Sequence, residues 1–554
     1  MGWVHWPPYD VGAWVEELWT CFRATGSVHE VTGFMRRVAG ALAALPFDRI
    51  GTERRVLETE AGAYPASLHQ RLMKRRFGAT GHGLGAYLEF GLRDVSAELL
   101  EEWRRRFFTS GNAAVWMTAR PPDDLELHLP PGNRVPPPTP EPIPGLSLPA
   151  QGTDPDGDVT MSFLGPDTHA MAVGSLVAER RIDDDVRTGL GVTYEVAGDY
   201  AALDAATSHV WVSADCADSN AVLVRDRIQS ILDALADNGP TDGELALLAA
   251  EHSRWEHDSR LLEFFLDRAA KDHLRGLPLE QPADRIEARR GLRPADVAQA
   301  WRDALGSALV LVPPSARGAR GRYAPYGRAV PPARGTRYRQ NPARVEDPRG
   351  AIVLGRDRVT FRWPGRDPRT VPFAEVAALV EDAPGTFSVI GLDGSTVEVT
   401  ARDLVDGQEL ERLLRERIPR ALWVPLPRNL AALGRLAGEL EDPSRVNAEL
   451  YELPGLIDPE EMPFALAEAS RGRRIGAVLA TDRRFLWLYA GKEEDRLDLP
   501  WQAVRELRVE REGLVVEAGG RPVRLKRIRP AAAADRIVSE FTERSRQGTT
   551  LSEA

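Results

Sequence analysis

Two glutamates and two histidines have spacings that suggest specific chemistry. Glu53 and Glu60 are seven residues apart, and because two helical turns span about 7.2 residues, both carboxylates lie on one face of a helix. Among the neighbouring arginines, the same pair also fits an ordinary charged helix face. His252 and His257 lie about 140° apart around a helix, so they cannot easily share a metal ion. We expect them to be solvated, and the other histidines are scattered and indicate no cluster.

Composition excludes several classes of protein. The chain has 554 residues, 43% hydrophobic and 28% charged, which is typical of a soluble globular protein with three or four domains. The net charge of -11 argues against a general nucleic-acid binder, which needs a basic face. Two cysteines, Cys21 and Cys216, supply neither a disulfide framework nor a C-x-x-C metal site. The sequence shows no signal peptide and no run of about 18 uncharged apolar residues, so we expect a cytoplasmic protein.

Two proline-rich stretches divide the chain. Residues 129–152 lack hydrophobic periodicity, and their prolines fix φ and remove hydrogen-bond donors, so we expect a linker. Residues 314–344 are basic and rich in glycine and proline, which indicates an extended, solvated tether. Contact of this tether with an acidic partner or RNA is the alternative. The stretches leave two segments, 1–128 and 153–313, before the tether.

The two segments contain elements in a similar order and look like related lobes. In the first, the spacing of apolar residues predicts a strand at 18–24, helices at 29–44 and 96–108, and a strand at 113–118. In the second, it predicts strands at 159–163, 193–197, 209–214 and 308–312, and helices at 171–178, 220–237 and 294–305. A further helix begins at Thr241, where Glu244 completes a capping box.

Several strings in these segments resemble the insulinase/pitrilysin family of metallopeptidases, particularly its shorter members akin to the mitochondrial processing peptidase. Residues 45–60 are similar to the family's helix with a glutamate zinc ligand, 77–83 to the loop that follows it, and 187–194 (RTGLGVTY) to a string of the second lobe. The resemblance covers roughly residues 10–313. It implies two α/β lobes, Glu60 as a zinc ligand supported by Glu53, and Arg187 and Tyr194 as residues that hold the substrate carbonyl.

One departure from the family concerns catalysis. Members are inverzincins, whose H-x-x-E-H motif supplies two zinc ligands and the general base. No such string occurs in this sequence, and the 59 residues before Glu60 leave no room for it. A lone glutamate cannot hold a catalytic zinc ion. We therefore expect the chain as written to have no catalytic residues and no bound zinc. Either it is a natural non-catalytic homologue, or its assigned start is too late and an upstream extension supplies the motif.

The C-terminal part predicts two small modules, 345–425 and 463–546, each made of short strands followed by a helix, with a connector at 426–462 and a tail at 547–554. Asp393-Gly394 between two strand-like runs is a strong hairpin signal. The string at 478–488 (VLATDRRFLWL) resembles bacterial pleckstrin-homology-like domains, and the first module is similar but weaker. The basic run at 521–529 is either a site for acidic lipid headgroups or a solvated strand edge.

These observations together predict a multidomain α+β protein: two insulinase-like α/β lobes, the first incomplete, followed by two small antiparallel β modules. Our first hypothesis is a metallopeptidase homologue that binds an extended peptide between its lobes, by adding it to a sheet edge. The alternative is a non-catalytic partner or assembly subunit of an active homologue, as a homodimer or heterodimer, with the pleckstrin-like modules recruiting it to a protein or membrane surface.

Overall fold

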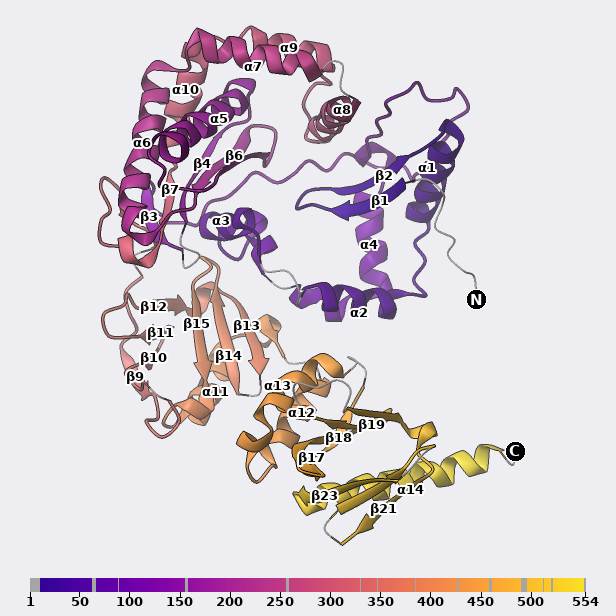
Figure 1. Ribbon diagram of the computed structural model, residues 1–554. Helices are drawn as coiled ribbons and strands as arrows, with labels where there is room; N and C mark the ends of the chain where they lie inside the picture. Colours follow the sequence, from indigo (N-terminus) through magenta and orange to yellow (C-terminus); the bar gives the residue numbers. More distant parts are fainter. Residues whose placement is uncertain are drawn as a thin grey trace. The chain divides into compact units, whose positions relative to one another are not determined.

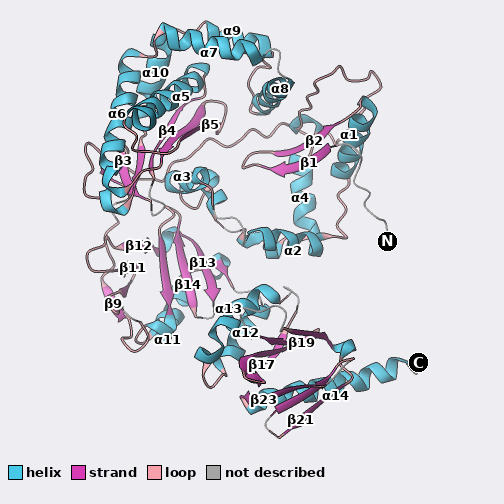
Figure 2. Ribbon diagram, viewed as in Figure 1, coloured by secondary structure: helices cyan, strands magenta, loops and turns pink. Residues whose placement is uncertain are grey.

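The computed structural model contains both helices and strands, as the α+β prediction requires (Figures 1 and 2). Its chain divides into two compact units, Met1–Val330 and Pro331–Ala554. In the part that the structure describes, no helix is both long and apolar enough to cross a membrane. The described residues are 10–61, 66–87, 89–154, 158–255, 259–328, 330–345, 347–383, 385–425, 428–457, 461–489, 496–511, 513–519 and 522–552.

A six-stranded sheet organises the first unit, in the order β5-β6-β4-β7-β3-β8. β4, β5 and β6 are antiparallel, whereas β3 runs parallel to both β7 and β8. The central strand β7 reads LVLV and is buried on both faces, as a continuous apolar run requires. The strands are β3 (Ala150–Thr153), β4 (Val159–Pro166), β5 (Val196–Ala202), β6 (Thr207–Ala214), β7 (Leu309–Val312) and β8 (Ala324–Pro325).

Helices cover both faces of this sheet (Figure 1). α5 (His169–Ile182), α6 (Ala221–Asn238) and α10 (Pro294–Leu305) enclose the main core, where the Phe163 and Trp301 rings meet edge to face. α5 and α10 approach closely at Gly174, where a Cβ atom would lie 2.6 Å from the Trp301 indole nitrogen. On the opposite face, α3 (Leu68–Phe77) packs Leu72 against the alternate residues of β7, Leu309 and Leu311.

The other elements of the first unit start where local signals predict. Ser27 and Glu30 form a capping box at the start of α1, and Ser96 caps α4, which confirms the helix predicted at 96–108. β1 and β2 form an antiparallel hairpin. The elements are β1 (Asp10–Val15), β2 (Thr20–Thr25), α1 (Val28–Ala43), α2 (Ile50–Ala61), α4 (Ala97–Phe107), α7 (Asp242–Trp255), α8 (Ser259–Leu274) and α9 (Pro282–Arg290).

Two predictions about irregular segments are wrong. Residues 113–118 form no strand, and Val115 is 53% exposed, because an apolar segment becomes a strand only when a neighbouring strand pairs with it. Residues 314–344 are not a solvated tether: Tyr323 is buried and Tyr326 donates to the Arg75 carbonyl at 2.8 Å. β8 lies at the edge of the sheet, where a proline is tolerated. The division between the two units falls inside this segment.

The second unit begins with two four-stranded sheets, ordered β12-β11-β10-β9 and β15-β14-β13-β16. Both sheets and α11 contribute to one core, which includes Ile352, Phe387 and Leu410. β14 and β15 form the hairpin predicted at Asp393-Gly394, where Gly394 has a φ of 77°. The elements are β9 (Gly335–Arg339), β10 (Ala351–Gly355), β11 (Arg358–Arg362), β12 (Arg369–Pro372), β13 (Val376–Ala383), β14 (Thr386–Gly391), β15 (Thr396–Thr400), α11 (Gly407–Arg417) and β16 (Trp423–Val424).

The chain ends in a seven-stranded antiparallel sheet, ordered β20-β19-β18-β17-β23-β22-β21. Alternate residues of β18 face two different cores: Val478 packs on the α14 side, whereas Leu479 packs against α12 and α13. The connector expected at 426–462 is thus largely helical. The elements are α12 (Arg428–Gly438), α13 (Asn447–Leu456), β17 (Pro463–Arg471), β18 (Arg474–Thr481), β19 (Arg484–Leu488), β20 (Leu497–Pro500), β21 (Glu506–Glu510), β22 (Gly513–Glu517), β23 (Val523–Arg529) and α14 (Ala531–Ser552).

Candidate functional site

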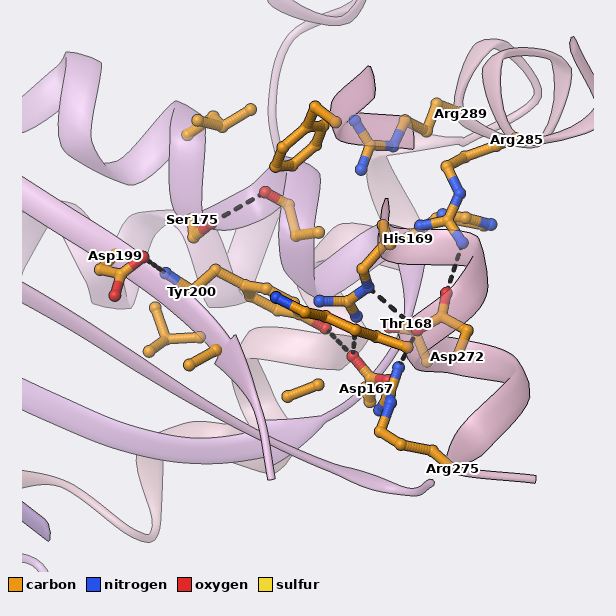
Figure 3. A pocket seen from close by; sticks show the side chains of 18 of the residues that line it. Asp167, Thr168, His169, Ser175, Asp199, Tyr200, Asp272, Arg275, Arg285 and Arg289 are labelled. Atoms are coloured by element: carbon orange, nitrogen blue, oxygen red, sulfur yellow. Dashed lines mark hydrogen bonds and ion pairs between the residues drawn. The ribbon is translucent and has the colours of Figure 1, made fainter. Parts of the chain in front are cut away.

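A cavity of about 930 Å³ lies in the first unit beside the edge strand β5 (Figure 3). Residues of β5, α5, α8, α9 and the β1–β2 turn line it. Five consecutive residues of β5, 198–202, take part. Because successive side chains of a strand point to opposite faces, a cavity that touches all five runs along the edge of the strand.

Two hydrogen bonds show which backbone groups of β5 face away from β6. The Asp215 N–H donates to the Glu195 carbonyl at 3.3 Å, so the odd-numbered residues bond to β6. The Tyr200 N–H instead donates to the Asp199 carboxylate at 2.8 Å. By this alternation, Gly198 and Tyr200 present their backbone groups at the free edge. Gly198 has no side chain, and the Glu179 carboxylate lies beside it, 3.2 Å from the position that a Cβ atom would take.

A buried ion network centred on Asp167 forms the inner wall of the cavity. Its carboxylate accepts hydrogen bonds from the Tyr200 hydroxyl, from Arg268 at 3.0 Å and from Arg275. Only 4% of the Asp167 side chain and 2% of the Arg275 side chain are exposed. Burial of charges is tolerated when they are paired and hydrogen-bonded, so the network ties β5 and α8 to the start of α5.

The network continues along α8 and α9. Asp272 pairs with Arg268 at 3.0 Å and with Arg285 at 2.5 Å. Arg285 also pairs with Glu280 at 3.1 Å, and the His169 imidazole lies 3.0 Å from Glu280. Figure 3 shows His169, Asp272 and Arg285, which come from α5, α8 and α9.

Electrostatics divide the cavity into two ends. Burial alone would raise the pKa of Asp272, but the positive charge of Arg268 and the other arginines outweighs it and lowers that pKa. At the same end, burial and the positive charges of Arg285 and Arg268 lower the pKa of Arg289 to about 10. On α5, burial raises the pKa of Glu179. The lining from α8 to α9 thus combines basic residues with several carboxylates, whereas α5 and β5 contribute the carboxyl groups of Glu179 and Asp199.

The arrangement suits binding of an elongated ligand. An open strand edge supplies backbone donors and acceptors, and the exposed side chains of Phe264 and Leu279 supply apolar contacts at the rim, with 56% and 62% of each exposed. The hydroxyl groups of Ser175 and Tyr200 are already hydrogen-bonded, to Ala172 and Asp167 respectively.

The structure does not bring the predicted metal residues together at a described site. Glu53 is an exposed residue of α2 and pairs with Arg49 at 2.8 Å. Glu60 belongs to the same helix, but its side chain lies outside the described residues, as do the side chain of His252 and all of His257. Across the described ranges, no group of three or more histidine, cysteine, aspartate or glutamate side chains is arranged to hold a metal ion.

The predicted substrate residues lie near the start of β5 but outside the cavity lining. Arg187 is half exposed and pairs with Asp183 through two hydrogen bonds of 2.6 and 2.9 Å. Tyr194 is 86% exposed, two residues before β5 begins, and its N–H donates to Asp215 at 2.8 Å.

Sequence reasoning missed the residues that build the cavity wall. Asp167 and Arg275 are 108 positions apart, and Asp167 and Tyr200 are 33 apart. No short motif connects them. The available signal was weak: an aspartate directly before the Thr168 N-cap of α5.

Comparisons with known proteins give a distant structural likeness. No family model matches the chain. No curated protein matches it. Among solved structures, it resembles an inactive M16 peptidase domain from Pseudomonas fluorescens, with 16% identity, a TM-score of 0.44, and 58% of this chain and 82% of that one covered. It also resembles the first half of the periplasmic protease PqqL from Escherichia coli, with 12% identity, a TM-score of 0.39, and 55% of this chain and 75% of that one covered. For pitrilysin the identity is 15%, the TM-score is 0.42, and 55% of this chain and 37% of that one are covered. These structural neighbours are M16 peptidase-like.

Proposed function

We propose that the first unit binds an extended polypeptide by strand addition to β5. The observation that carries this proposal is the outer edge of β5, which pairs with no strand among the described residues and lies in a cavity of about 930 Å³. A peptide that pairs with an edge strand gains backbone hydrogen bonds without regard to its sequence, and pockets beside the edge select its side chains. The five cavity-lining residues of β5 would pair with about 17 Å of peptide at roughly 3.3 Å per residue.

The residues of the edge support this mode of binding. At Gly198 no side chain of the strand itself blocks the edge, although Glu179 lies beside it. At the next edge position, the Asp199 carboxylate occupies the Tyr200 N–H. An incoming peptide carbonyl would replace that carboxylate. A peptide that extends beyond the start of β5 would reach Tyr194 and Arg187, and we propose these as contacts of its carbonyl groups, as the family resemblance implies.

The activity proposed is binding without hydrolysis by this chain. Zinc-dependent hydrolysis of the family's type uses two histidines from H-x-x-E-H, a string that the 554-residue sequence does not contain. We propose Glu60, supported by Glu53, as the equivalent of one ligand of the family's zinc site. A single carboxylate cannot hold a zinc ion by itself.

Backbone methylation of the ligand tests strand addition directly. A fluorescent peptide that binds the full chain is made in two versions of one sequence, N-methylated on alternate residues in either register. The versions differ only in which edge of the peptide is blocked. We expect one version to lose binding and the other to keep it, as measured by fluorescence anisotropy. Equal affinities would show that the peptide does not bind as a strand.

A protein variant provides the matching test. Asp199→Ala removes the carboxylate that occupies the Tyr200 N–H. We expect tighter peptide binding by this variant, because the freed donor no longer has to exchange one partner for another. Weaker or unchanged binding would argue against pairing at this edge.

A second candidate function is favoured by exposed apolar side chains in the first 128 residues. Trp14, Leu99, Trp103 and Val115 are 40% to 57% exposed, which is typical of surfaces that another polypeptide covers. On this reading the chain is an assembly subunit that joins an active homologue or a second copy. Light scattering alone and with a candidate homologue tests it: Trp103→Glu is expected to abolish association, and a monomer in every mixture would contradict it.

The second unit would serve recruitment in this assembly. Its last sheet consists of two meanders, β17–β20 and β21–β23, joined by pairing of β17 with β23 and packed against a C-terminal helix. This arrangement supports the pleckstrin-like interpretation of the sequence. We propose that the two modules dock to a protein or membrane surface.

A further inference from the structure

Three histidines from distant parts of the sequence meet at the turn of the β1–β2 hairpin. His69 lies on α3, His82 on the 3-10 helix Gly81–Ala86 and His209 on β6. His69 and His82 approach the Glu17 carboxylate of the hairpin turn to 3.5 and 4.0 Å, and the rings of His69 and His209 are 5.1 Å apart. We call these three histidines and Glu17 the histidine cluster. The spacing of these histidines in the sequence does not indicate that they meet, since His69 and His209 are 140 positions apart.

Burial leaves the ring nitrogens of the cluster poorly solvated. His209 is fully buried, and only 4% of the His82 side chain is exposed. One ring nitrogen of each histidine, Nδ1 of His69 and His209 and Nε2 of His82, is buried without a hydrogen-bond partner. A buried imidazole that gains a proton therefore gains a donor and a charge that its surroundings do not satisfy.

The charged groups that act on the cluster are one arginine and two carboxylates, which cannot balance three protonated histidines. Arg76 of α3 is 1% exposed and donates to the Ser162 hydroxyl, which also contacts His209 at 3.0 Å. Glu17 is the one carboxylate within 4 Å of a cluster imidazole among the described residues, and the more remote Asp204 accepts the N–H groups of Ala206 and Thr207. The other nearby charged groups have partners of their own: Arg71 with Asp154, Arg75 with the Thr153 carbonyl, Lys74 with the Tyr87 ring, and Glu16 with Lys271.

The hairpin turn that the cluster holds is also part of the cavity. Glu16 and Trp19 line the cavity, and Lys271 of α8 pairs with Glu16 at 2.9 Å. Movement of the turn away from α3 would therefore open one wall of the site beside β5.

We propose that the histidine cluster is a pH-sensitive latch, which holds the β1–β2 turn in the cavity wall at neutral pH and releases it in mildly acidic solution. One proton on the cluster forms an ion pair with Glu17. A second and third proton meet imidazolium groups and Arg76 in a largely buried space, where Asp204 is the one further carboxylate that acts on His82. Separating α3, β6 and the hairpin turn relieves the resulting repulsion.

The direction of the pH effect follows from the pKa values. Burial lowers the pKa of His82 below its ordinary 6.5 despite the attraction of Glu17. Burial, Arg76 and the other histidines lower the pKa of His209 further. The open form thus binds more protons than the closed form, so closure is favoured above about pH 6.5 and progressively penalised below it. Each additional proton bound on opening shifts the equilibrium about tenfold per pH unit.

Hydrogen exchange of the full chain tests the latch. Amide exchange is measured by mass spectrometry at pH 7.5 and pH 5.5 and corrected for the intrinsic rate at each pH. We expect peptides covering 16–25 and 68–86 to exchange at least about tenfold faster at the lower pH, while peptides covering β7 and α6 are unchanged. Equal corrected exchange at the two pH values would overturn the proposal. Acid-induced exchange that spreads equally to β7 would also overturn it, because it indicates global unfolding.

Substitutions identify the groups responsible. His82→Gln and His209→Gln replace imidazoles by neutral amides, and we expect each to reduce the acid response at least threefold. If the buried His209→Gln variant does not fold, His82→Gln and Glu17→Gln still test the latch. Glu17→Gln removes the compensating carboxylate and should move opening to higher pH. His128→Gln is the matched control, because 84% of that side chain is exposed and its ring pairs with Glu126 on the surface. A full acid response in folded His82→Gln would refute the latch.

Discussion

The ion network around Asp167 makes a strong prediction about the stability of the first unit. Asp167→Asn keeps the size of the side chain but removes the negative charge that pairs with Arg268 and Arg275. Because Arg275 is 2% exposed, water cannot take the place of the lost partner. The other carboxylate partner of Arg275, Asp272, is already shared with Arg268 and Arg285. We expect a lower midpoint for the thermal unfolding of the first unit, followed by differential scanning calorimetry.

The size of the effect can be worked out from the burial. Removing one partner of a buried ion pair costs about 3–5 kcal/mol. The first unit spans residues 1–330, and at about 2.1 cal/mol/K per residue its unfolding entropy is roughly 0.7 kcal/mol/K. Dividing the two gives a fall in the unfolding midpoint of about 4 to 7 °C.

A surface ion pair of the same chemistry is the control. Asp183→Asn breaks the pair with Arg187, in which 28% and 50% of the two side chains are exposed. Such pairs contribute at most about 1 kcal/mol, so the midpoint should fall by less than about 1.5 °C. If Asp167→Asn melts within 1.5 °C of the unaltered protein, or no lower than the control, the network does not stabilise the unit and the reasoning fails.

Two further carboxylates give independent predictions. Glu461 is fully buried and accepts hydrogen bonds from Arg484 at 2.8 Å and Thr481 at 2.6 Å. Glu461→Gln should therefore destabilise the second unit by about 3–5 kcal/mol and leave the calorimetric unfolding transition of the first unit unchanged. A shift in the transition of the first unit instead would contradict this prediction. Arg181 lowers the pKa of Glu244 to about 2. A carboxyl group with a lowered pKa stabilises the folded state at pH values above its ordinary pKa, and this stabilisation is lost as the pH falls toward 2. Glu244→Gln should therefore lower the free energy of unfolding, measured in urea, by about 1 kcal/mol at pH 7 and by progressively less between pH 4.5 and pH 3. A loss of stability that does not change with pH would contradict this prediction.

Elements whose signals are local in the sequence were predicted well. Ser96 caps α4, and Thr241 exchanges hydrogen bonds with Glu244 in the capping box expected at 241. The Asp393-Gly394 turn joins two paired strands. In each case the interacting residues lie within four positions of one another, so a short stretch of sequence contains every residue that the cap or turn needs.

Predictions that needed a distant partner were the ones that failed. The apolar run at 113–118 has strand composition, but no strand in the described part of the chain pairs with it. The segment at 314–344 has linker composition, yet Tyr323 finds a place in the core of the first unit. Composition describes what a segment can tolerate, whereas burial depends on the surface that another segment offers.

The sequence by itself determined the α+β composition, the starts of the capped helices and the absence of H-x-x-E-H from these 554 residues. Tertiary structure alone decided where charge is concentrated. Asp167 meets Arg275 across 108 positions, and His69 of α3 meets His209 of β6 across 140. Pairing of buried charges and shifts of pKa depend on distances of a few ångströms between side chains, and only packing of the sheet against its helices sets those distances.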